Sequence, residues 1–351
     1  TQYVLPEEDI EVKVSNFYSK IKDPVLANPE LKFTGDIHAT RLYPSPLPDL
    51  FKGEQLVLVG RYSGKGDSAV VIEGTVNGER KKFTYEVKFP AESSEHEFIP
   101  RLWATRRVGY LMDEIRLHGE NPELRDEVTE LARKNGIVTP YTAYLIMEDE
   151  SRRGVTSSLQ SLPQLQQDVK AREEAGKNYF RYKTDKDGDG AVAGSRYGLA
   201  LKSADSSSAA INGGQVESLR SLALPAGESE AFRRRYGRLP ESAALTPAQT
   251  TNSISPAGPE SAPARLVEYT QQTQFVAGRN FFQNRGQWID SQAQKLPNAK
   301  RVRVQFGSAD YFDLLKKHPE TAPWLALGTQ VQFVLDNAIY EIYDDNAAVQ
   351  K

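Results

Sequence analysis

The chain has 351 residues, enough for two or three domains with hydrophobic cores of their own. Its formal net charge of −3 argues against a general binder of nucleic acid or other polyanions, although it allows local basic patches. The absence of cysteine excludes disulfides, thiol nucleophiles and cysteine-bound zinc. No apolar run reaches the roughly 18 residues that a membrane-spanning helix needs, so no membrane span is expected.

The N-terminal stretch resembles the end of a larger domain. TQYVLPEEDIEV is read as the end of a strand that passes straight into a helix, and no charged and apolar leader precedes it. Residues 7–22 are predicted to form that helix, which Asp23-Pro24 ends. Its apolar face would contain Ile10, Val14, Phe17 and Ile21. We therefore expect the chain to be part of a longer protein, whose upstream segment could hold the main site.

Between Leu31 and Pro90 apolar and polar residues alternate with a period of two, which is typical of strands. The strand candidates are LKFTGDIHATRLYP, QLVLVGRY, SAVVIEGTVNG and KKFTYEVKFP. Asn77-Gly78 lies between two alternating runs and predicts a hairpin. An antiparallel meander of these strands, in residues 30–90, would make half of a β-sandwich that an upstream segment could complete.

The strongest local pattern begins at Phe98. Residues at helical spacing predict a long helix with one apolar face, formed by Ala104, Val108, Leu111 and Ile115. Gly119 follows at a position where glycine commonly ends a helix. Asn121-Pro122 then predicts the N-cap and first turn of a second helix, which Gly136 ends.

A strand is predicted after these helices. Residues 137–147 are rich in β-branched and aromatic side chains, and Thr139-Pro140 would lead into the strand. Residues 91–148 would thus form a compact helix-helix-strand unit. No catalytic constellation is visible within it.

The composition changes after Glu148. Residues 149–265 are rich in Ser, Ala, Gln, Gly and Pro and have few large apolar side chains, so a long flexible linker is expected. Short helices, such as one over residues 159–172, could interrupt it. Order is expected to return in residues 266–345 as a small α+β module.

The C-terminal module is predicted to contain two hairpins, a strand and a helix. The hairpins turn at residues 284–286 and 336–337, and KRVRVQF is the strand. Ser308 is predicted to cap the helix SADYFDLLKKH, which Pro319 ends.

GRYSGKGDS at residues 60–68 resembles a phosphate-binding loop. Such a loop needs four residues between its first glycine and Gly-Lys, whereas only three intervene here and Gly66 follows Lys65. Strands are predicted on both sides, although a phosphate loop opens a helix. A hairpin turn is the favoured interpretation, and no cofactor is predicted for this chain.

DKDGDG at residues 185–190 is similar to the start of a calcium loop, with oxygens from Asp185, Asp187 and Asp189. The position that should carry a bidentate carboxylate is Arg196, and no clear pair of flanking helices is predicted. A solvated acidic turn is the favoured interpretation, and these aspartates are the metal candidates of the sequence.

FRRRYGR at residues 232–238 is a basic cluster with aromatic residues inside the predicted linker. It could contact an acidic polysaccharide, a nucleic acid or a lipid headgroup, or be a protease site, through Arg233, Arg234, Arg235 and Arg238. A solvated linker segment is the favoured interpretation, and no nucleic-acid partner is predicted.

The histidines are isolated in the sequence, at His38, His96, His118 and His318. His118 and His318 fall at predicted helix C-termini, where an imidazole suits the helix dipole, so caps are favoured over ligands or bases. No GxSxG elbow or paired histidine spacing occurs, so no catalytic residue is predicted.

A long run of the sequence resembles a known family. RLWATRRVGYLMDEIRLHGENPELRDEVTELARKNGIVTPYTAYL, preceded by YPSPLPDLFKGEQLVLVGRY, resembles the region just after the von Willebrand A domain of inter-alpha-trypsin inhibitor heavy chains. The likeness covers roughly residues 1–150 and is closer still to bacterial proteins that combine a VIT domain with a von Willebrand A domain. FVAGRNFFQNRGQWIDS and SADYFDLLKKHPETAPWLALG resemble the C-terminal module of those bacterial members.

This resemblance implies that residues 1–24 are the last strand and helix of a von Willebrand A domain, and that a VIT segment completes the sandwich. The family's metal motif, Asp-x-Ser-x-Ser, is not in this sequence, so a divalent cation is expected only upstream. The Asp-Pro-His-Phe attachment sequence of vertebrate heavy chains is also absent. The resemblance also implies export, and the lack of cysteines and glycosylation sequons fits a bacterial envelope protein, periplasmic or secreted, better than an animal serum protein.

The leading hypothesis is a non-enzymatic, extracytoplasmic adhesion or scaffold protein that braces an upstream von Willebrand A head. Its expected fold class is α+β with several domains: half a β-sandwich, a helical pair, a long disordered linker and a small α+β module. Its expected partner is a protein or an extracellular matrix or envelope ligand. The alternatives are an accessory part of an envelope hydrolase or peptidase, and a calcium- or glycan-binding module.

Overall fold

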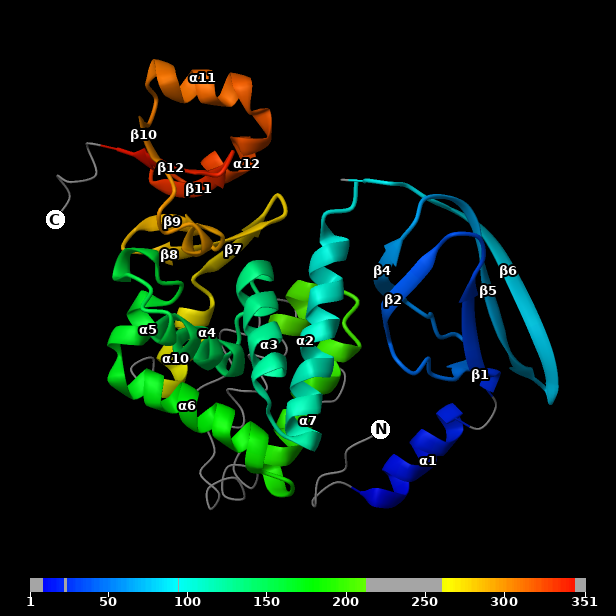
Figure 1. Cartoon of the computed structure of the whole chain (residues 1–351). Coiled ribbons are helices and arrows are strands. Elements are labelled where there is room, and N and C mark those ends of the chain that lie inside the picture. Colours follow the sequence, from blue (N-terminus) through cyan, green and yellow to red (C-terminus); the bar gives the residue numbers. More distant parts are fainter. Residues whose placement is uncertain (1–8, 22–23, 94, 213–260, 345–351) are drawn as a thin grey trace. The chain divides into compact units, whose positions relative to one another are not determined.

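The structure is a computed structural model that describes residues 9–21, 24–93, 95–212 and 261–344 (Figure 1). The fold is α+β with more than one domain, which confirms the predicted fold class. The chain divides into two compact units, and the division falls within one helix, after Arg107. Unit 1 contains Thr1–Arg107 and Lys202–Ser206, and unit 2 contains Val108–Leu201 and Ser207–Lys351. Among the described helices, none is both long and apolar enough to cross a bilayer.

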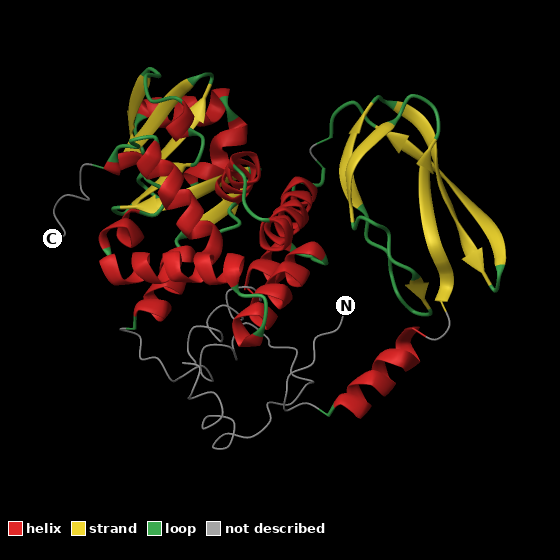
Figure 2. Ribbon diagram, turned by 60° about the horizontal axis from the view of Figure 1, so that its bottom comes forward, coloured by secondary structure: helices red, strands yellow, loops and turns green. Residues whose placement is uncertain are grey.

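Unit 1 begins with helix α1 (Ile10–Ile21), which confirms the first predicted helix, and continues as two antiparallel sheets (Figure 2). The four-stranded sheet has the order β3-β1-β5-β6, and the two-stranded sheet pairs β2 with β4. The strands are β1 (Pro24–Phe33), β2 (His38–Tyr43), β3 (Leu50–Phe51), β4 (Val59–Ser63), β5 (Gly66–Val76) and β6 (Glu79–Phe89).

The strands of unit 1 do not form the predicted meander. Residues 31–44 were expected to be one strand, but the chain turns at Gly35 and continues in β2. The segment 60–68 is not a hairpin, because β4 pairs with β2 whereas β5 pairs with β1 and β6. The Asn77-Gly78 hairpin is confirmed: both residues have positive φ, 51° and 81°, as the mirror-image turns of hairpins require.

The core of unit 1 is formed by buried apolar residues from its strands and from the first half of helix α2 (Phe98–His118). Trp103 on that helix is 9% exposed, and its indole Nε1 donates a hydrogen bond to the Arg41 carbonyl oxygen at 3.0 Å. The other members include Leu26, Ile37, Tyr43, Val59, Val71, Leu102 and Ala104.

Unit 2 begins in the second half of α2, which ends before Gly119 as predicted. Helix α3 (Pro122–Asn135) also follows the prediction, because the Asn121 side chain accepts a hydrogen bond from the Leu124 N–H at 2.8 Å. Gly136 ends this helix with a left-handed φ of 64°. Local sequence therefore determines where these helices begin and end: Asn-Pro starts α3, and a glycine follows the end of each helix.

The strand predicted over residues 137–147 is wrong. These residues lead into helix α4 (Pro140–Arg152), whose N-cap is Thr139. Thr139 has extended backbone, as a residue before proline should, but Pro140 stands at the first helical turn and Thr142 completes a capping box. The β-branched and aromatic side chains are buried on several sides of this helix, so burial overrides their strand preference.

Much of the predicted linker 149–265 is also folded. It contains η1 (Ser157–Leu159), α5 (Pro163–Gln167), α6 (Val169–Thr184), α7 (Gly188–Lys202) and α10 (Ala262–Thr270). Small residues that suggested disorder pack tightly instead: Ala171 and Ala175 of α6 are fully buried. Residues 213–260, which hold the rest of the predicted linker, lie outside the described residues.

The C-terminal part of unit 2 is a mixed six-stranded sheet in the order β10-β12-β11-β9-β8-β7, with α11 (Ala309–Lys317) and the short α12 (Ala322–Leu325). Ser308 caps α11 as predicted, and both predicted hairpins are present. A core of aromatic residues fills this part, including Phe281, Phe333 and Trp324. The strands are β7 (Thr273–Val276), β8 (Arg279–Asn284), β9 (Gln287–Asp290), β10 (Arg301–Gln305), β11 (Val331–Leu335) and β12 (Ala338–Tyr343).

Candidate functional site

The structure does not provide the calcium loop that Asp185, Asp187 and Asp189 suggested. Helix α7 begins at Gly188, so the backbone becomes helical at the fourth position of a loop that should continue for about twelve residues. Asp185 instead ends helix α6, and its Oδ1 accepts a hydrogen bond from the Thr184 hydroxyl at 3.1 Å. Within the described parts of the chain, no three acidic or histidine residues are grouped to hold a metal ion.

The other sequence candidates are also dispersed. Residues 60–68 run from strand β4 into strand β5, so the segment does not open a helix as a phosphate loop does. His118 and His318 lie at the ends of α2 and α11, where they were predicted, and pair with Glu114 and Glu320. The basic cluster of Arg233, Arg234, Arg235 and Arg238 lies outside the described residues.

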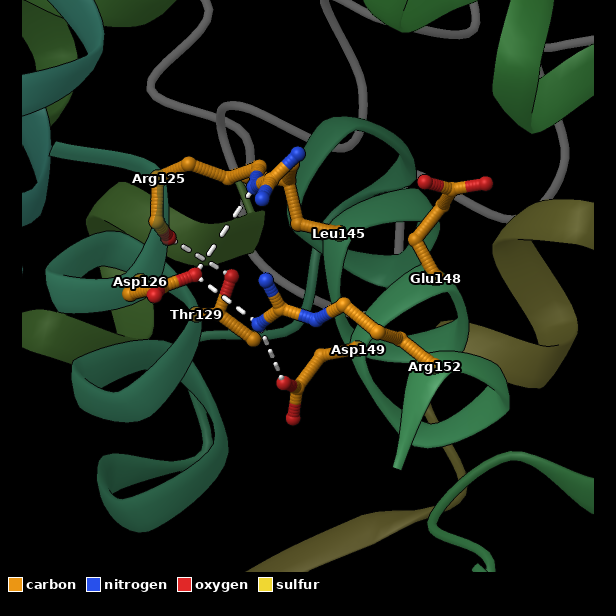
Figure 3. A pocket seen from close by; sticks show the side chains of 7 residues that line it. All are labelled: Arg125, Asp126, Thr129, Leu145, Glu148, Asp149 and Arg152. Carbon is orange, nitrogen blue, oxygen red and sulfur yellow. Dashed lines mark hydrogen bonds and ion pairs between the residues drawn. The ribbon is translucent and has the colours of Figure 1, made fainter. Parts of the chain in front are cut away.

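A small hollow between α3 and α4 in unit 2 collects more charged side chains than any sequence candidate (Figure 3). Arg152 of α4 bridges Asp126 of α3 at 3.0 Å and Asp149 of α4 at 3.1 Å. The hollow encloses about 20 Å³, which is room for one water molecule and far below the several hundred Å³ of a substrate pocket. The lining residues are Arg125, Asp126, Thr129, Leu145, Glu148, Asp149 and Arg152.

Asp149 is the acceptor at the centre of this cluster. It also pairs with the buried Arg133 at 2.7 Å and with Arg153 at 2.8 Å. Burial acts to raise the pKa of Asp149, but hydrogen bonds from Arg133 and Arg152 outweigh it and leave the pKa below its ordinary value. A carboxylate that is ionised and surrounded by arginines is a poor general acid or base, and its ion pairs join α3 to α4.

A second polar centre surrounds Glu150, which is fully buried. Its Oε1 accepts hydrogen bonds from the Ser161 hydroxyl at 2.5 Å and from the Gln294 side-chain amide at 2.6 Å. Burial raises the pKa of Glu150, although these donors favour the ionised form. Ser161 is 1% exposed, so its hydroxyl does not reach the surface of the structure. The centre connects α4 to the segment before α5 and to η2 (Ala293–Lys295).

A third centre joins helix α6 to helix α10. Asp168 caps α6 by accepting a hydrogen bond from the Ala171 N–H at 3.0 Å. The same carboxylate accepts from Arg265 Nε at 2.6 Å and from the Tyr269 hydroxyl at 3.2 Å. The hydrogen bond from Arg265, followed by that from Ala171, holds the pKa of Asp168 well below its usual range.

Asparagine side chains attach the C-terminal sheet to the helices of unit 2. Asn280 of β8 is fully buried, and its Nδ2 donates to the Arg133 carbonyl oxygen at 2.8 Å. Asn284 of the same strand donates to the carbonyl oxygens of Ser157 and Gln160 at 2.8 and 3.0 Å. These bonds satisfy backbone groups at a helix end and in a loop, which would otherwise be buried without partners.

Most of these contacts could not be predicted from the sequence. Glu150 and Gln294 are 144 residues apart, and Asn280 and Arg133 are 147 apart, so no local spacing connects them. The N-cap pattern at Asp168 was a detectable signal, because Asp before a run of helix-forming residues is a common helix start. It was overlooked inside a stretch interpreted as linker.

Fold and site together describe a class of protein: a multidomain α+β protein whose buried charged and amide groups join helices to a sheet. In sequence it is similar to inter-alpha-trypsin inhibitor heavy chain H3 of Mesocricetus auratus, with 25% identity over 166 residues. Heavy chain H3 of Rattus norvegicus is 25% identical over 170 residues. Each match covers 44% of this chain and only 19% of the relative.

These similarities support a distant relationship to the inter-alpha-trypsin inhibitor heavy chains, which is part of the predicted resemblance. No protein-family model matches the chain. No solved structure matches it either. The closer likeness to bacterial proteins, and the place of this chain within a longer one, stay predictions.

Proposed function

We propose that this chain is a non-enzymatic scaffold that supports and follows a von Willebrand A ligand-binding domain. One observation carries the proposal: the buried charged and amide groups of unit 2 are used to join elements distant in sequence. Glu150 with Gln294, Asp168 with Arg265, and Asn280 with Arg133 join segments separated by 97 to 147 residues. Side chains whose hydrogen bonds are used in this way hold the elements of unit 2 in one rigid body and are not available to act on a substrate.

The distant similarity to heavy chain H3 supports the von Willebrand A association, since the resembling sequence is expected directly after that domain. An adhesive role, with a protein or an extracellular matrix or envelope ligand, is part of this proposal. So is an extracytoplasmic location in a bacterial envelope. No observation on the described residues favours a hydrolase accessory. The calcium-binding alternative needs an extended loop after Asp185, but helix α7 begins at Gly188 in its place.

The coding sequence upstream of Thr1 is the quickest test of the proposal. A leader peptide, a VIT segment and an Asp-x-Ser-x-Ser motif should be found there. In the protein encoded by that longer sequence, magnesium-dependent ligand binding should require the upstream head, whereas the present chain alone should turn over no substrate. Hydrolysis of any substrate by this chain, abolished by one side-chain change within it, would refute the scaffold function.

A further inference from the structure

Strand β6 is the edge of the four-stranded sheet in unit 1 (Figure 1). It pairs with β5 along its whole length, from Glu79 opposite Val76 to Phe89 opposite Gly66, and with no other described strand. About half of the N–H and C=O groups of an edge strand in an antiparallel sheet point away from the neighbouring strand. An 11-residue edge of this kind is a template for one more strand.

One face of β6 is apolar and exposed from Phe83 onward; Glu79 and Lys81, at the start of the same face, pair with each other at 2.6 Å. Side chains alternate across a strand, so Phe83, Tyr85 and Val87 share a face, and they are 41%, 55% and 38% exposed. On the same face Ile72 of β5 lies opposite Phe83, and Val70 lies opposite Tyr85; both are only partly buried. The apolar surface therefore continues from the edge into the sheet.

The opposite face of β6 is cationic. It presents Arg80, Lys82 and Lys88 against one carboxylate, Glu86. Arg80 is paired with Glu30 and Glu73, whereas the Lys82 and Lys88 ammonium groups form no ion pair with any residue that the structure describes.

Lysines on an edge strand commonly serve only to prevent aggregation. Protection against aggregation explains the cationic face of β6, but it does not explain the three exposed apolar side chains on the opposite face. The strand carries four basic and two acidic residues, so a second copy of β6 would bring like charges together. A strand with apolar residues on one face and carboxylates on the other complements both faces at once.

We propose that β6 is a docking edge for an extended acidic segment of a partner protein, which adds to the sheet as a further antiparallel strand. Its apolar residues pack on Phe83, Tyr85 and Val87, and its alternating carboxylates face Lys82 and Lys88. Backbone hydrogen bonds supply affinity, and the two faces supply specificity. The proposal depends on unit 1 alone and is independent of the scaffold function proposed above.

The test uses the whole chain and a fluorescent capped peptide of about nine residues, a usual strand length, in which valine or threonine alternates with glutamate. Two control peptides share its composition: one carries N-methyl groups on alternate amides, and one has the glutamates in a block. Fluorescence anisotropy should show saturable binding of the alternating peptide only. N-methylation should abolish it, because the added strand then cannot donate to the edge.

Charge reversal on the chain provides the matched comparison. Lys82→Glu with Lys88→Glu should weaken peptide binding about tenfold or more, since close opposite charges become like charges. Lys52→Glu with Lys170→Glu makes the same charge change at exposed sites outside β6, one beside β3 at the other edge of the sheet and one in unit 2, and should leave the affinity within about twofold. Circular dichroism before and after heating would show that both variants fold.

Three results would overturn the proposal. They are no binding to the unaltered chain, equal binding of the N-methylated peptide, and equal losses in the two charge-reversed variants. A dimer of the unaltered chain in sedimentation that Phe83→Ser dissolves would instead assign the edge to a second copy.

Discussion

At the scale of single residues, Glu150 shows burial and hydrogen bonding acting on one carboxyl group in opposite directions. Burial dominates and raises the pKa of Glu150 above its ordinary value of 4.5. The folded chain therefore binds a proton that the unfolded chain has released, and the associated stability is fully present below the unfolded pKa. That stability is lost as pH rises through the folded pKa.

Glu150→Gln should therefore flatten the fall in unfolding free energy between about pH 4.5 and neutrality, because glutamine does not titrate. Glu150→Ala should cost about 2–3 kcal/mol at any pH in this range, since the buried donors of Ser161 and Gln294 lose their acceptor. Urea unfolding followed by circular dichroism at several pH values measures both. A pH dependence in Glu150→Gln equal to that of the unaltered chain would contradict this account.

At Asp168 the pKa shift, and therefore the dependence of stability on pH, has the opposite sign to that at Glu150. Because Arg265 holds its pKa below the usual value, its stabilising contribution is present above the unfolded pKa, and it is lost as pH falls through the folded pKa. Asp168→Asn keeps a good N-cap but loses the ion pair, so it should cost about 1–2 kcal/mol near neutrality and less in acid. Ser308→Asn changes a cap whose hydroxyl accepts a hydrogen bond from the Tyr311 N–H and does not titrate, so its effect should not vary with pH. Coincident pH profiles for the two variants would contradict a stabilising role of the ionised Asp168 carboxylate.

Residue-level prediction from sequence succeeded where a side chain acts within its own turn. Asn121, Gly136 and Ser308 each satisfy or end the helix beside them, so the local order of residues was sufficient. The Glu150–Gln294 and Asp168–Arg265 contacts act across more than 90 residues of sequence, and no residue near Glu150 in the sequence predicts its contact with Gln294.

At the scale of elements, helix α4 shows that a capping sequence alone does not decide between helix and strand. The Thr139 hydroxyl is buried and bonds to the Tyr197 hydroxyl at 2.9 Å, while the Thr142 side chain accepts from the Thr139 N–H at 2.9 Å. The same Thr-Pro pair suits a strand entrance and a helix start. Only the fold around it, which buries the residues that follow, selects the helix.

Thr139→Val keeps the volume of this cap but removes its hydroxyl. The change should cost about 2–3 kcal/mol of unfolding free energy, because it leaves the Tyr197 hydroxyl and a helix N–H without partners. Asn121→Ala, at an exposed cap, should cost only about 1 kcal/mol. Thermal or urea unfolding compares the two. Equal losses would mean that the buried network adds nothing to an ordinary cap.

At the scale of the whole molecule, composition and periodicity were enough to predict the α+β class and several domains. They were not enough to predict where the chain divides into its two units. Residues 157–202 look like linker because their large apolar side chains are scattered, yet α6 packs through small residues such as Ala171 and Ala175. The C-terminal sheet likewise looked like a separate module, because the polar contacts that join it to the helices leave no periodic pattern.

The central claim is that the helices and the C-terminal sheet of unit 2 form one cooperative body. Gln294→Ala removes an amide that donates to Glu150, to the Leu159 carbonyl oxygen and to the Ser161 hydroxyl, and Gln274→Ala is its exposed control on β7. Hydrogen exchange by mass spectrometry measures protection segment by segment. Gln294→Ala should speed exchange in α4 and α6 as well as in β9, β11 and β12, and leave β5 in unit 1 unchanged. Faster exchange confined to residues 273–343 would contradict the account.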